Sequence, residues 1–229
     1  MVTRHPAVTA NAVMTLNMLS KGRAVLGVGA GDSAVRTAGL SPARLPEIRK
    51  RIEFMRALLQ GQEVDALQWD VDKEENTWGA ESLVRLIGAE EWGNAPIQLA
   101  CMGPKSVRAA GEICDGVIVD GHMGGNAEGV RKTVETAIEG AESVGKDPST
   151  LRYIAAIDAA IDDDRTKALD KVRPTAARNI ANKPWLPDTL GVDHADVVKQ
   201  VTESYKFYKH LDLTAKHREL IPDEVAMKC

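Results

Sequence analysis

Two kinds of segment alternate along the chain. Short apolar runs are separated by longer stretches in which apolar residues recur every three or four positions. The apolar runs predict buried strands, and the periodic stretches predict amphipathic helices. The predicted strands are residues 23–29, 97–103, 116–121 and 151–161. The helices predicted between and after them are residues 46–61, 104–114, 126–144 and 165–181, the last with a kink at Pro174. This cadence indicates a parallel α/β sheet with crossover helices, either doubly wound or a (β/α) barrel.

A further helix precedes the first strand. Val8, Ala12, Leu16 and Leu19 recur about every four residues, so residues 7–19 predict an amphipathic helix that closes at residues 20–22. Between about 62 and 95 the pattern is irregular, which indicates a hairpin-like excursion or a loop. From about 188 the chain reads as a helical C-terminal part. We expect one domain over residues 1–229.

Composition limits the classes of function. The 229 residues are 44% hydrophobic and 27% charged, with a formal net charge of −4 and no basic stripe, which argues against a nucleic-acid partner. No apolar stretch has the length of a membrane helix, and we expect a cytoplasmic protein. Cys101, Cys114 and Cys229 form no CxxC pair, and we interpret the first two as small buried side chains rather than nucleophiles.

The first candidate site is a glycine turn that follows the first strand. Gly29 and Gly31 lie there, with Asp32 as the only carboxylate. Glycines let a ligand approach the backbone, and ligands of parallel sheets bind beyond the carboxyl ends of the strands. Two other interpretations of this run stay open. It matches a loose form of the dinucleotide-binding fingerprint, and it is also typical of a turn that requires small residues. Asp32 is either a proton donor or an Asx-turn residue.

The second candidate lies between the strand at 97–103 and the helix at 104–114. Met102, Gly103, Pro104 and Lys105 precede Ser106 there. Backbone N–H groups at a helix N-terminus, together with a lysine and a serine, suit a phosphate group. An ordinary strand-to-helix turn is the alternative.

The third candidate follows the strand at 116–121. Asp120, Gly121 and His122 begin a glycine-rich loop, where His122 is either delivered to a pocket or solvated. Neither a Cys/His cluster nor paired carboxylates with metal-ligand spacing occur in the sequence, so we expect no metal.

Three segments together resemble a known family. TRHPAVTANAVMTLNMLSKGRAVLGVGAGD, QLACMGPKSVRAAGEICDGVIV and LRYIAAIDAAIDDDR are similar, in order and spacing, to the luciferase-like flavin and deazaflavin oxidoreductases, especially the methylenetetrahydromethanopterin-reductase-like branch. The resemblance implies a (β/α)8 TIM-type barrel with coenzyme F420 (a deazaflavin) or FMN at the carboxyl ends of its strands. It implies hydride transfer between that cofactor and a small organic substrate.

The resemblance also assigns roles. Met102 and Gly103 would hold the cofactor phosphate with help from Asp120 and Gly121, and Asp32 would assist proton transfer. By comparison with the family, the first three strands and the last strand are missing, so we expect a partial barrel and either self-association or a partner that supplies strands. Two alternatives stay open: a truncated, non-catalytic flavin-binding or barrel-completing relative, and an NAD(P)-dependent dehydrogenase of the Rossmann type.

Overall fold

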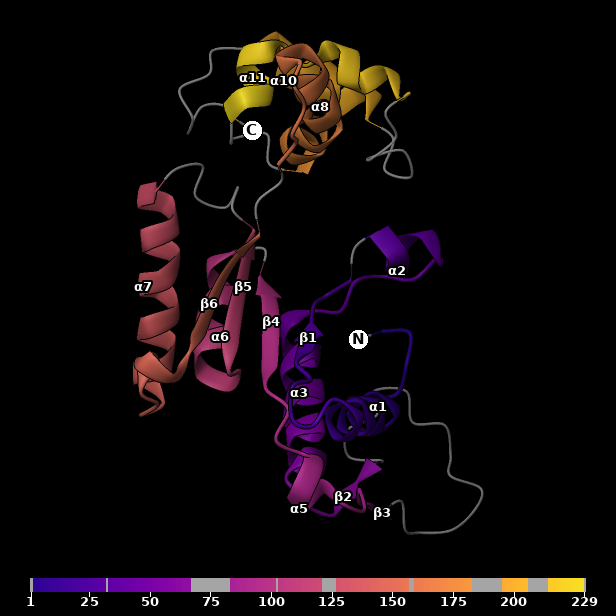
Figure 1. Ribbon diagram of the computed structural model, residues 1–229, viewed down its shortest axis with the longest axis vertical. Helices are drawn as coiled ribbons and strands as arrows, with labels where there is room; N and C mark the ends of the chain where they lie inside the picture. The colour runs from indigo at the N-terminus through magenta and orange to yellow at the C-terminus, as the bar shows by residue number, and fades with distance from the viewer. Residues whose placement is uncertain are drawn as a thin grey trace. The chain divides into compact units, whose positions relative to one another are not determined.

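The computed structural model describes residues 2–31, 33–66, 83–101, 103–120, 127–156, 159–182, 195–205 and 214–228. The chain divides into two compact units (Figure 1). Unit 1 comprises residues 1–119 and 135–154, and unit 2 comprises residues 120–134 and 155–229. The single domain expected from the sequence stays a prediction, and each unit is described by itself.

Unit 1 is built on a sheet with the strand order β1-β4-β5-β6. These strands are β1 (Leu26–Val28), β4 (Ile97–Cys101), β5 (Gly116–Asp120) and β6 (Arg152–Ala156). β1 pairs with β4, and β4 with β5, in parallel. The parallel α/β sheet predicted from the sequence is confirmed. Each of the four observed strands lies within the segment predicted for it.

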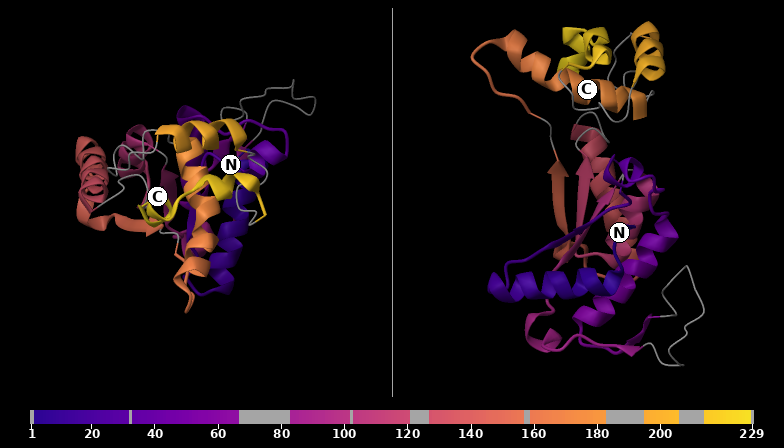
Figure 2. Two further views of the ribbon diagram at one scale, coloured as in Figure 1. Left: turned by 90° about the horizontal axis from the view of Figure 1, so that it is seen from above. Right: turned by 90° about the vertical axis from the view of Figure 1, so that its right-hand side faces the viewer.

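The sheet is covered by helices on one face. Large apolar side chains of β4 and β5 alternate toward that face and are buried: Ile97, Leu99, Cys101, Val117 and Val119. On the other face Ala100 is exposed and its neighbour by register, Ile118, is half-buried, whereas Gln98 near the start of β4 is buried. The strands stand to one side of their covering helices in the right-hand view of Figure 2. This period of two is the pattern of a sheet that buries one face.

Three helices form that cover. α3 (Leu45–Leu59) places Ile52, Phe54, Met55 and Leu58 in the core. Pro46 stands in its first turn, where a missing N–H costs nothing, and the Glu47 carboxylate accepts a hydrogen bond from the Arg44 N–H (2.8 Å). α6 (Pro104–Ile113) packs against β4 and α3.

The third covering helix, α7 (Ala127–Ser143), approaches α6 through glycines. A Cβ atom added at Gly111 would lie 2.1 Å from the Ala137 carbonyl oxygen, and one at Gly140 would lie 2.2 Å from the Arg108 carbonyl oxygen. Real side chains do not tolerate such contacts, so the close packing of the two helices requires glycine at both positions.

α1 (Pro6–Leu19) is confirmed as a helix, but it buries the face opposite to the predicted one. Pro6, Ala10, Val13 and Asn17 are buried against α3 and α5 (Ala89–Trp92), whereas Val8, Ala12, Leu16 and Leu19 are exposed. The cause is visible at Asn17, whose side chain is fully buried. Its amide donates to the Trp92 carbonyl (3.0 Å) and to Asn94 Oδ1 (2.7 Å), and its oxygen accepts from the Ala24 N–H (3.1 Å).

Smaller elements complete unit 1. α2 (Ser33–Thr37) is a short helix inside the segment predicted as a loop, and η2 (Pro148–Thr150) precedes β6. β2 (Val64–Asp65) and β3 (Leu83–Val84) pair antiparallel, as the predicted hairpin-like excursion requires. Residues 67–82, in the middle of this excursion, lie outside the described residues.

Unit 2 has a helical core of its own. It contains α8 (Arg165–Asn182), α10 (Ala195–Ser204), η4 (Lys216–Leu220) and α11 (Asp223–Lys228), with Pro174 inside α8 as predicted. Ala177, Ile180 and Val201 are fully buried where α8 and α10 meet. The Arg173 guanidinium joins α8 to α11 by a salt bridge to Asp223, and it also donates to the Ile221 carbonyl.

Asn17 provides a test of how α1 is held. We expect Asn17→Ala to lower the free energy of unfolding by roughly 2 to 4 kcal/mol, because it removes the three hydrogen bonds that this fully buried side chain makes to Trp92, Asn94 and Ala24. Urea unfolding measures the loss. Asn11→Ala, on an exposed position of the same helix, is the control and should change stability by less than about 0.5 kcal/mol. Equal effects of the two changes would contradict this account.

Candidate functional site

The carboxyl ends of β1, β4 and β5 lie side by side. The register pairs Val28 with Leu99, and Cys101 with Val119. Gly29 is therefore level with Ala100, and Asp120 stands one step beyond the level of Cys101. Since parallel strands open toward the same edge, the segments that follow them share that edge. The structure thus brings together the carboxyl ends of the three strands that precede the predicted site segments.

The glycines after β1 have different structural reasons. Gly31 has φ +80°, and a Cβ atom there would lie 2.3 Å from Val35 Cγ2, so the turn into α2 requires glycine. A Cβ atom at Gly29 would lie 3.6 Å from the Ala100 Cβ, which is ordinary contact distance. The turn alone explains why residue 31 is a glycine. Gly29, in contrast, brings the backbone after β1 close to Ala100 near the end of β4.

The segment after β4 forms the N-terminus of α6. Gly103 is the N-cap residue in an extended conformation, and Pro104 opens the helix. The Ser106 hydroxyl accepts from the Gly103 N–H (3.2 Å) and donates to the Gly103 carbonyl (2.8 Å), which fixes the loop. Pro104 has no N–H, and the Ser106 N–H donates to the Gly103 carbonyl (3.0 Å), so the first turn offers the Lys105 N–H together with the positive charge of the exposed Lys105 side chain. This arrangement suits a phosphate or another anion.

Space above Gly103 is open. A Cβ atom built there meets no other atom within 4 Å, and Pro104 and Lys105 are exposed. Asp32, Met102, Gly121 and His122 lie outside the described residues, as does the side chain of Asp120, which ends β5. The roles assigned to these five residues stay predictions.

Ser106 is a functional candidate whose role the sequence pattern left undefined. Three residues separate it from Gly103, the spacing at which a side chain reaches back to the N-cap backbone. It also hydrogen-bonds the Cys101 thiol at the end of β4. The hydroxyl therefore links the strand, the loop and the helix of the candidate anion site, and it acts by holding their backbone.

Both described cysteines are buried, as expected. Burial raises the pKa of the Cys101 thiol to about 11, and the hydrogen bond to Ser106 opposes this increase with a smaller effect. Burial also raises the pKa of Cys114 to about 12. A thiolate is the nucleophilic form, so neither side chain is activated near neutral pH.

Thiol alkylation tests this assignment. Below pH 9 we expect iodoacetamide to leave Cys101 and Cys114 unmodified in the folded protein and to label both after denaturation, as followed by peptide mass spectrometry. The rate should rise only as pH approaches the raised pKa values. Rapid labelling of Cys101 at pH 7 in the folded protein would show an activated thiol.

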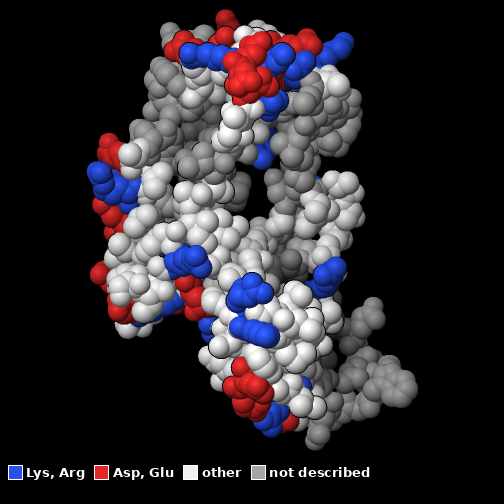
Figure 3. All heavy atoms as spheres, viewed as in Figure 1, with Lys and Arg blue, Asp and Glu red and all other residues white. Residues whose placement is uncertain are grey.

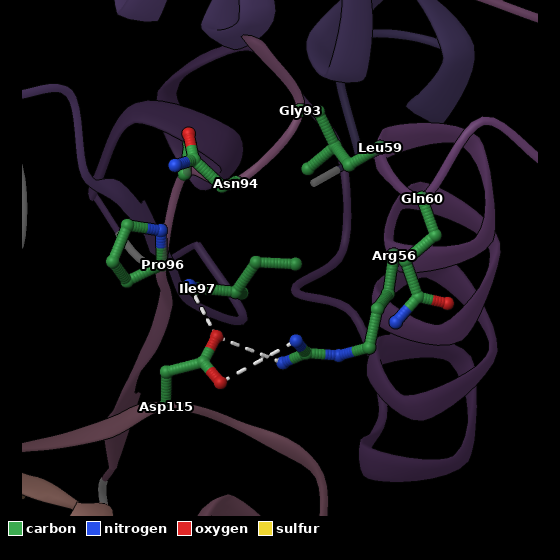
Figure 4. Close-up of a pocket in the computed structure, with 9 residues that line it drawn as sticks. Arg56, Leu59, Gln60, Gly93, Asn94, Pro96, Ile97 and Asp115 are labelled. Carbon is green, nitrogen blue, oxygen red and sulfur yellow. Dashed lines mark hydrogen bonds and ion pairs between the residues drawn. The ribbon is translucent and has the colours of Figure 1, made fainter. Parts of the chain in front are cut away.

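At the opposite, amino edge of the sheet, an ion pair joins α3 to two strands. Asp115 Oδ2 accepts from the Ile97 N–H (2.8 Å) and from Arg56 Nη2 (3.0 Å) (Figure 4). The same Arg56 nitrogen donates to the Ile113 carbonyl (2.9 Å). A cavity of about 340 Å³ lies beside this pair, lined also by Leu59, Gln60, Gly93, Asn94, Ala95 and Pro96.

This cavity lies at the edge where α/β barrels concentrate residues of structural rather than catalytic importance. A Cβ atom at Gly93 would lie 1.7 Å from the Leu59 carbonyl oxygen, so the backbone here is tightly packed. Sequence reasoning missed the pair because Arg56 and Asp115 are separated by 59 residues and belong to different elements. We assign it to the stability of unit 1.

Asp115→Asn tests that assignment. We expect a loss of roughly 1 to 2 kcal/mol in the free energy of unfolding, because the amide keeps one acceptor but gives up the charged contact with Arg56. The control is Glu139→Gln, which weakens an exposed pair with Arg108 (3.4 Å) and should cost about 0.5 kcal/mol or less. Denaturant unfolding at pH 7 measures both. A larger loss for the Glu139 variant would reject the assignment.

A parallel sheet with glycines and a helix N-terminus at its carboxyl edge defines an α/β protein of the barrel or doubly wound class. Comparison with known proteins decides the family. The chain matches the luciferase-like monooxygenase family over residues 1–225 and belongs to it.

Curated relatives include two enzymes of the same name. The chain is 30% identical over 196 residues to the 5,10-methylenetetrahydromethanopterin reductase of Methanolobus tindarius, covering 84% of this chain and 56% of the relative. It is 29% identical to that of Archaeoglobus fulgidus, covering 78% and 51%. An F420-dependent glucose-6-phosphate dehydrogenase of Nocardia farcinica is 30% identical, covering 74% and 49%. The chain thus spans about half the length of these relatives.

Solved structures show the same fold. The coenzyme F420-dependent tetrahydromethanopterin reductase of Methanopyrus kandleri superposes with a TM-score of 0.71 at 23% identity, covering 98% of this chain and 65% of that one. An F420-dependent secondary alcohol dehydrogenase gives 0.62 at 21%, covering 100% and 62%. Within the described residues, every helix is too short or too polar to span a membrane.

Proposed function

We propose that this chain is part of a barrel-type oxidoreductase that transfers a hydride between coenzyme F420, or FMN, and a small organic substrate. The observation that carries the proposal is the shared carboxyl edge of β1 and β4, where Gly29 meets the end of β4 and α6 begins at Gly103. Family membership and the F420-dependent relatives support the reaction class. The choice between F420 and FMN is left to experiment.

The described residues fit the phosphate of such a cofactor. Open space above Gly103 admits a ligand against the backbone, and Lys105 offers its N–H and its side-chain charge at the N-terminus of α6. Ser106 holds this cradle in shape through both backbone groups of Gly103. When bound, the cofactor supplies the hydride chemistry, and the protein supplies position and electrostatics.

In this proposal each segment of the carboxyl edge has a separate task. Gly103, Pro104 and Lys105 bind the phosphate, together with Met102. Asp120, Gly121 and His122, at and beyond the end of β5, complete the cofactor-binding side. Gly29 and Gly31 let the cofactor approach the backbone after β1, and Asp32 delivers or accepts a proton at the substrate. The substrate itself is a small molecule.

The alternatives are separated by binding and turnover. A non-catalytic relative would bind the cofactor without transferring hydride. A Rossmann-type dehydrogenase is not favoured. Its strand order reverses at a switch point, whereas β1, β4, β5 and β6 follow one another in a single direction across the sheet.

Spectroscopic titration tests the proposal. The purified chain is titrated with F420, FMN and NADPH, and absorbance and fluorescence report binding. We expect saturable binding of F420 or FMN. Binding of NADPH alone would overturn the proposal, and binding without hydride transfer to any offered substrate would leave the non-catalytic alternative.

Substitutions at the cradle locate the phosphate. Gly103→Val should weaken cofactor binding about tenfold or more while leaving the fold intact, since the new side chain enters open space. Gly103→Ala should have a smaller effect. Lys105→Met should weaken binding in the same assay, and Lys132→Met, at an exposed position of α7, is its matched control. Unchanged affinity in both the Gly103→Val and Lys105→Met variants would reject this placement.

A further inference from the structure

The cavity beside Arg56 and Asp115 has the size and the mixed lining of a small-molecule site. Its volume of about 340 Å³ lies within the range of such sites. Apolar side chains supply part of its wall, and they belong to Leu59, Ala95 and Ile97. We call it the amino-edge cavity.

One wall of the cavity is held in place by the fold itself. Residues 93–97 form this wall. Asn94 Oδ1 accepts from the buried Asn17 amide (2.7 Å), and the Ile97 N–H donates to Asp115 (2.8 Å). A wall that is ordered before a ligand arrives reduces the entropy lost on binding.

The Arg56 guanidinium borders the cavity and keeps hydrogen-bonding capacity. A guanidinium carries five N–H groups. Within the described residues, those of Arg56 donate to Asp115 Oδ1 (3.4 Å), to Asp115 Oδ2 (3.0 Å) and to the Ile113 carbonyl (2.9 Å). Two N–H groups therefore remain for a ligand, and the contacts with Asp115 fix the orientation of the guanidinium.

Gln60 adds donors of the same kind. Its Oε1 accepts from Gln62 (3.2 Å), whereas its NH2 group has no partner among the described residues. Figure 4 shows the Gln60 amide nitrogen turned toward the Arg56 side chain and the oxygen turned away. The Asp115 carboxylate is already engaged by Arg56 and Ile97. The side chains of the lining thus offer N–H donors in excess, which suits a ligand with oxygen acceptors.

Charge around the cavity is positive on balance. Arg56 and Asp115 oppose each other as a salt bridge. The Lys146 ammonium, which donates to the Cys114 carbonyl, interacts electrostatically with both of them. Two cations and one carboxylate leave one positive charge in excess. In Figure 3, Lys and Arg side chains also gather over α3.

Two features of the end of α3 could oppose a negative ligand, and both are neutralised. N–H groups of residues 60–62 donate to three carbonyls of the last helical turn (2.9 to 3.0 Å), so these carbonyls are satisfied. The Glu90 carboxylate lies near Gly61, but it is paired with Arg85 (2.6 Å).

We propose that the amino-edge cavity binds a small carboxylic acid with a short aliphatic body. Its carboxylate accepts from Arg56 and Gln60, and its carbon chain lies against the apolar wall. A single negative charge matches the excess positive charge, whereas a phosphate dianion would exceed it and meet Asp115. The site lies at the edge of the sheet opposite to the proposed cofactor site, so this proposal does not depend on the proposed function.

Titration of the whole chain with butanoate tests the proposal, and butanamide is the uncharged comparison. Heteronuclear NMR reports binding through the Ile97 backbone amide and the Gln60 side-chain amide. We expect saturable binding of butanoate at least about tenfold tighter than that of butanamide. Absence of saturation below about 50 mM butanoate, or equal binding of the two compounds, would overturn the proposal.

A matched pair of variants locates the site. Gln60→Glu should weaken butanoate binding about tenfold or more, because it replaces a donor with a carboxylate facing the ligand. Gln62→Glu adds the same charge at an exposed position outside the lining, and it should change the affinity by no more than about twofold at physiological ionic strength. Both positions lie beyond the last residue of α3, so folding is retained. Equal effects of the two changes would reject this placement of the carboxylate.

Discussion

The pairing of β4 with both of its neighbours is the constraint on which the rest of unit 1 depends. This strand alone is hydrogen-bonded to β1 on one side and to β5 on the other. Its register sets which residues reach the carboxyl edge together, and its helix-facing side chains define the core. Because the partners are parallel, a shift of two residues at β4 would move the loop of Gly103 away from Gly29 while keeping the buried face intact.

The two edges of the sheet divide the tasks of stability and of the proposed cofactor binding. At the amino edge, the Asp115 carboxylate accepts hydrogen bonds from the Ile97 N–H and from Arg56. The backbone around the cavity beside this pair is tightly packed. At the carboxyl edge, the segment after β4 combines open space above Gly103 with the N–H and the exposed, charged side chain of Lys105. Ser106 is the one described side chain that stiffens this edge, and it does so without occupying the space above the loop.

Periodicity predicted the positions of the strands and helices well, and the runs of β4 and β5 lie beneath helices, whereas the residues of β6 are exposed or half-buried. It failed where one residue overrides the pattern. In α1, the stripe of Val8, Ala12, Leu16 and Leu19 looks like the buried face, yet a single buried asparagine with partners in α5 and beyond turns the helix the other way. The alternation in IQLAC, with large residues at every second position, was the available signal that only one face of the sheet is covered.

The candidate site was predictable in part for a related reason. Gly29, Gly103 and Asp120 follow strand-like runs, and the carboxyl ends of parallel strands meet at one edge whatever the lengths of the connections. The sequence contains no comparable signal for the pairing of Arg56 with Asp115, because a contact between a helix and the start of a strand has no fixed sequence spacing. The role of Ser106 was predictable only in part. Its spacing from Gly103 indicates a helix cap, but only the structure shows that the hydroxyl also hydrogen-bonds the Cys101 thiol.

Exposed apolar residues of this chain fall into two groups that call for different explanations. Among the described large hydrophobic side chains, those of Ile87 and Ile161 are the most exposed, at 94% and 93%, but each is a single exposed side chain: Leu86 beside Ile87 is buried, and Asp162 follows Ile161. Burying one isoleucine against a partner would release too little apolar area to offset the loss of translational freedom on association. The exposed apolar residues of α1 are individually less exposed, but they follow one another along one side of a helix without charged residues. Hydrogen bonds of the buried Asn17 fix the orientation of that helix. Contiguity on a rigid support, rather than the exposure of any one side chain, is what makes an apolar surface capable of holding a partner.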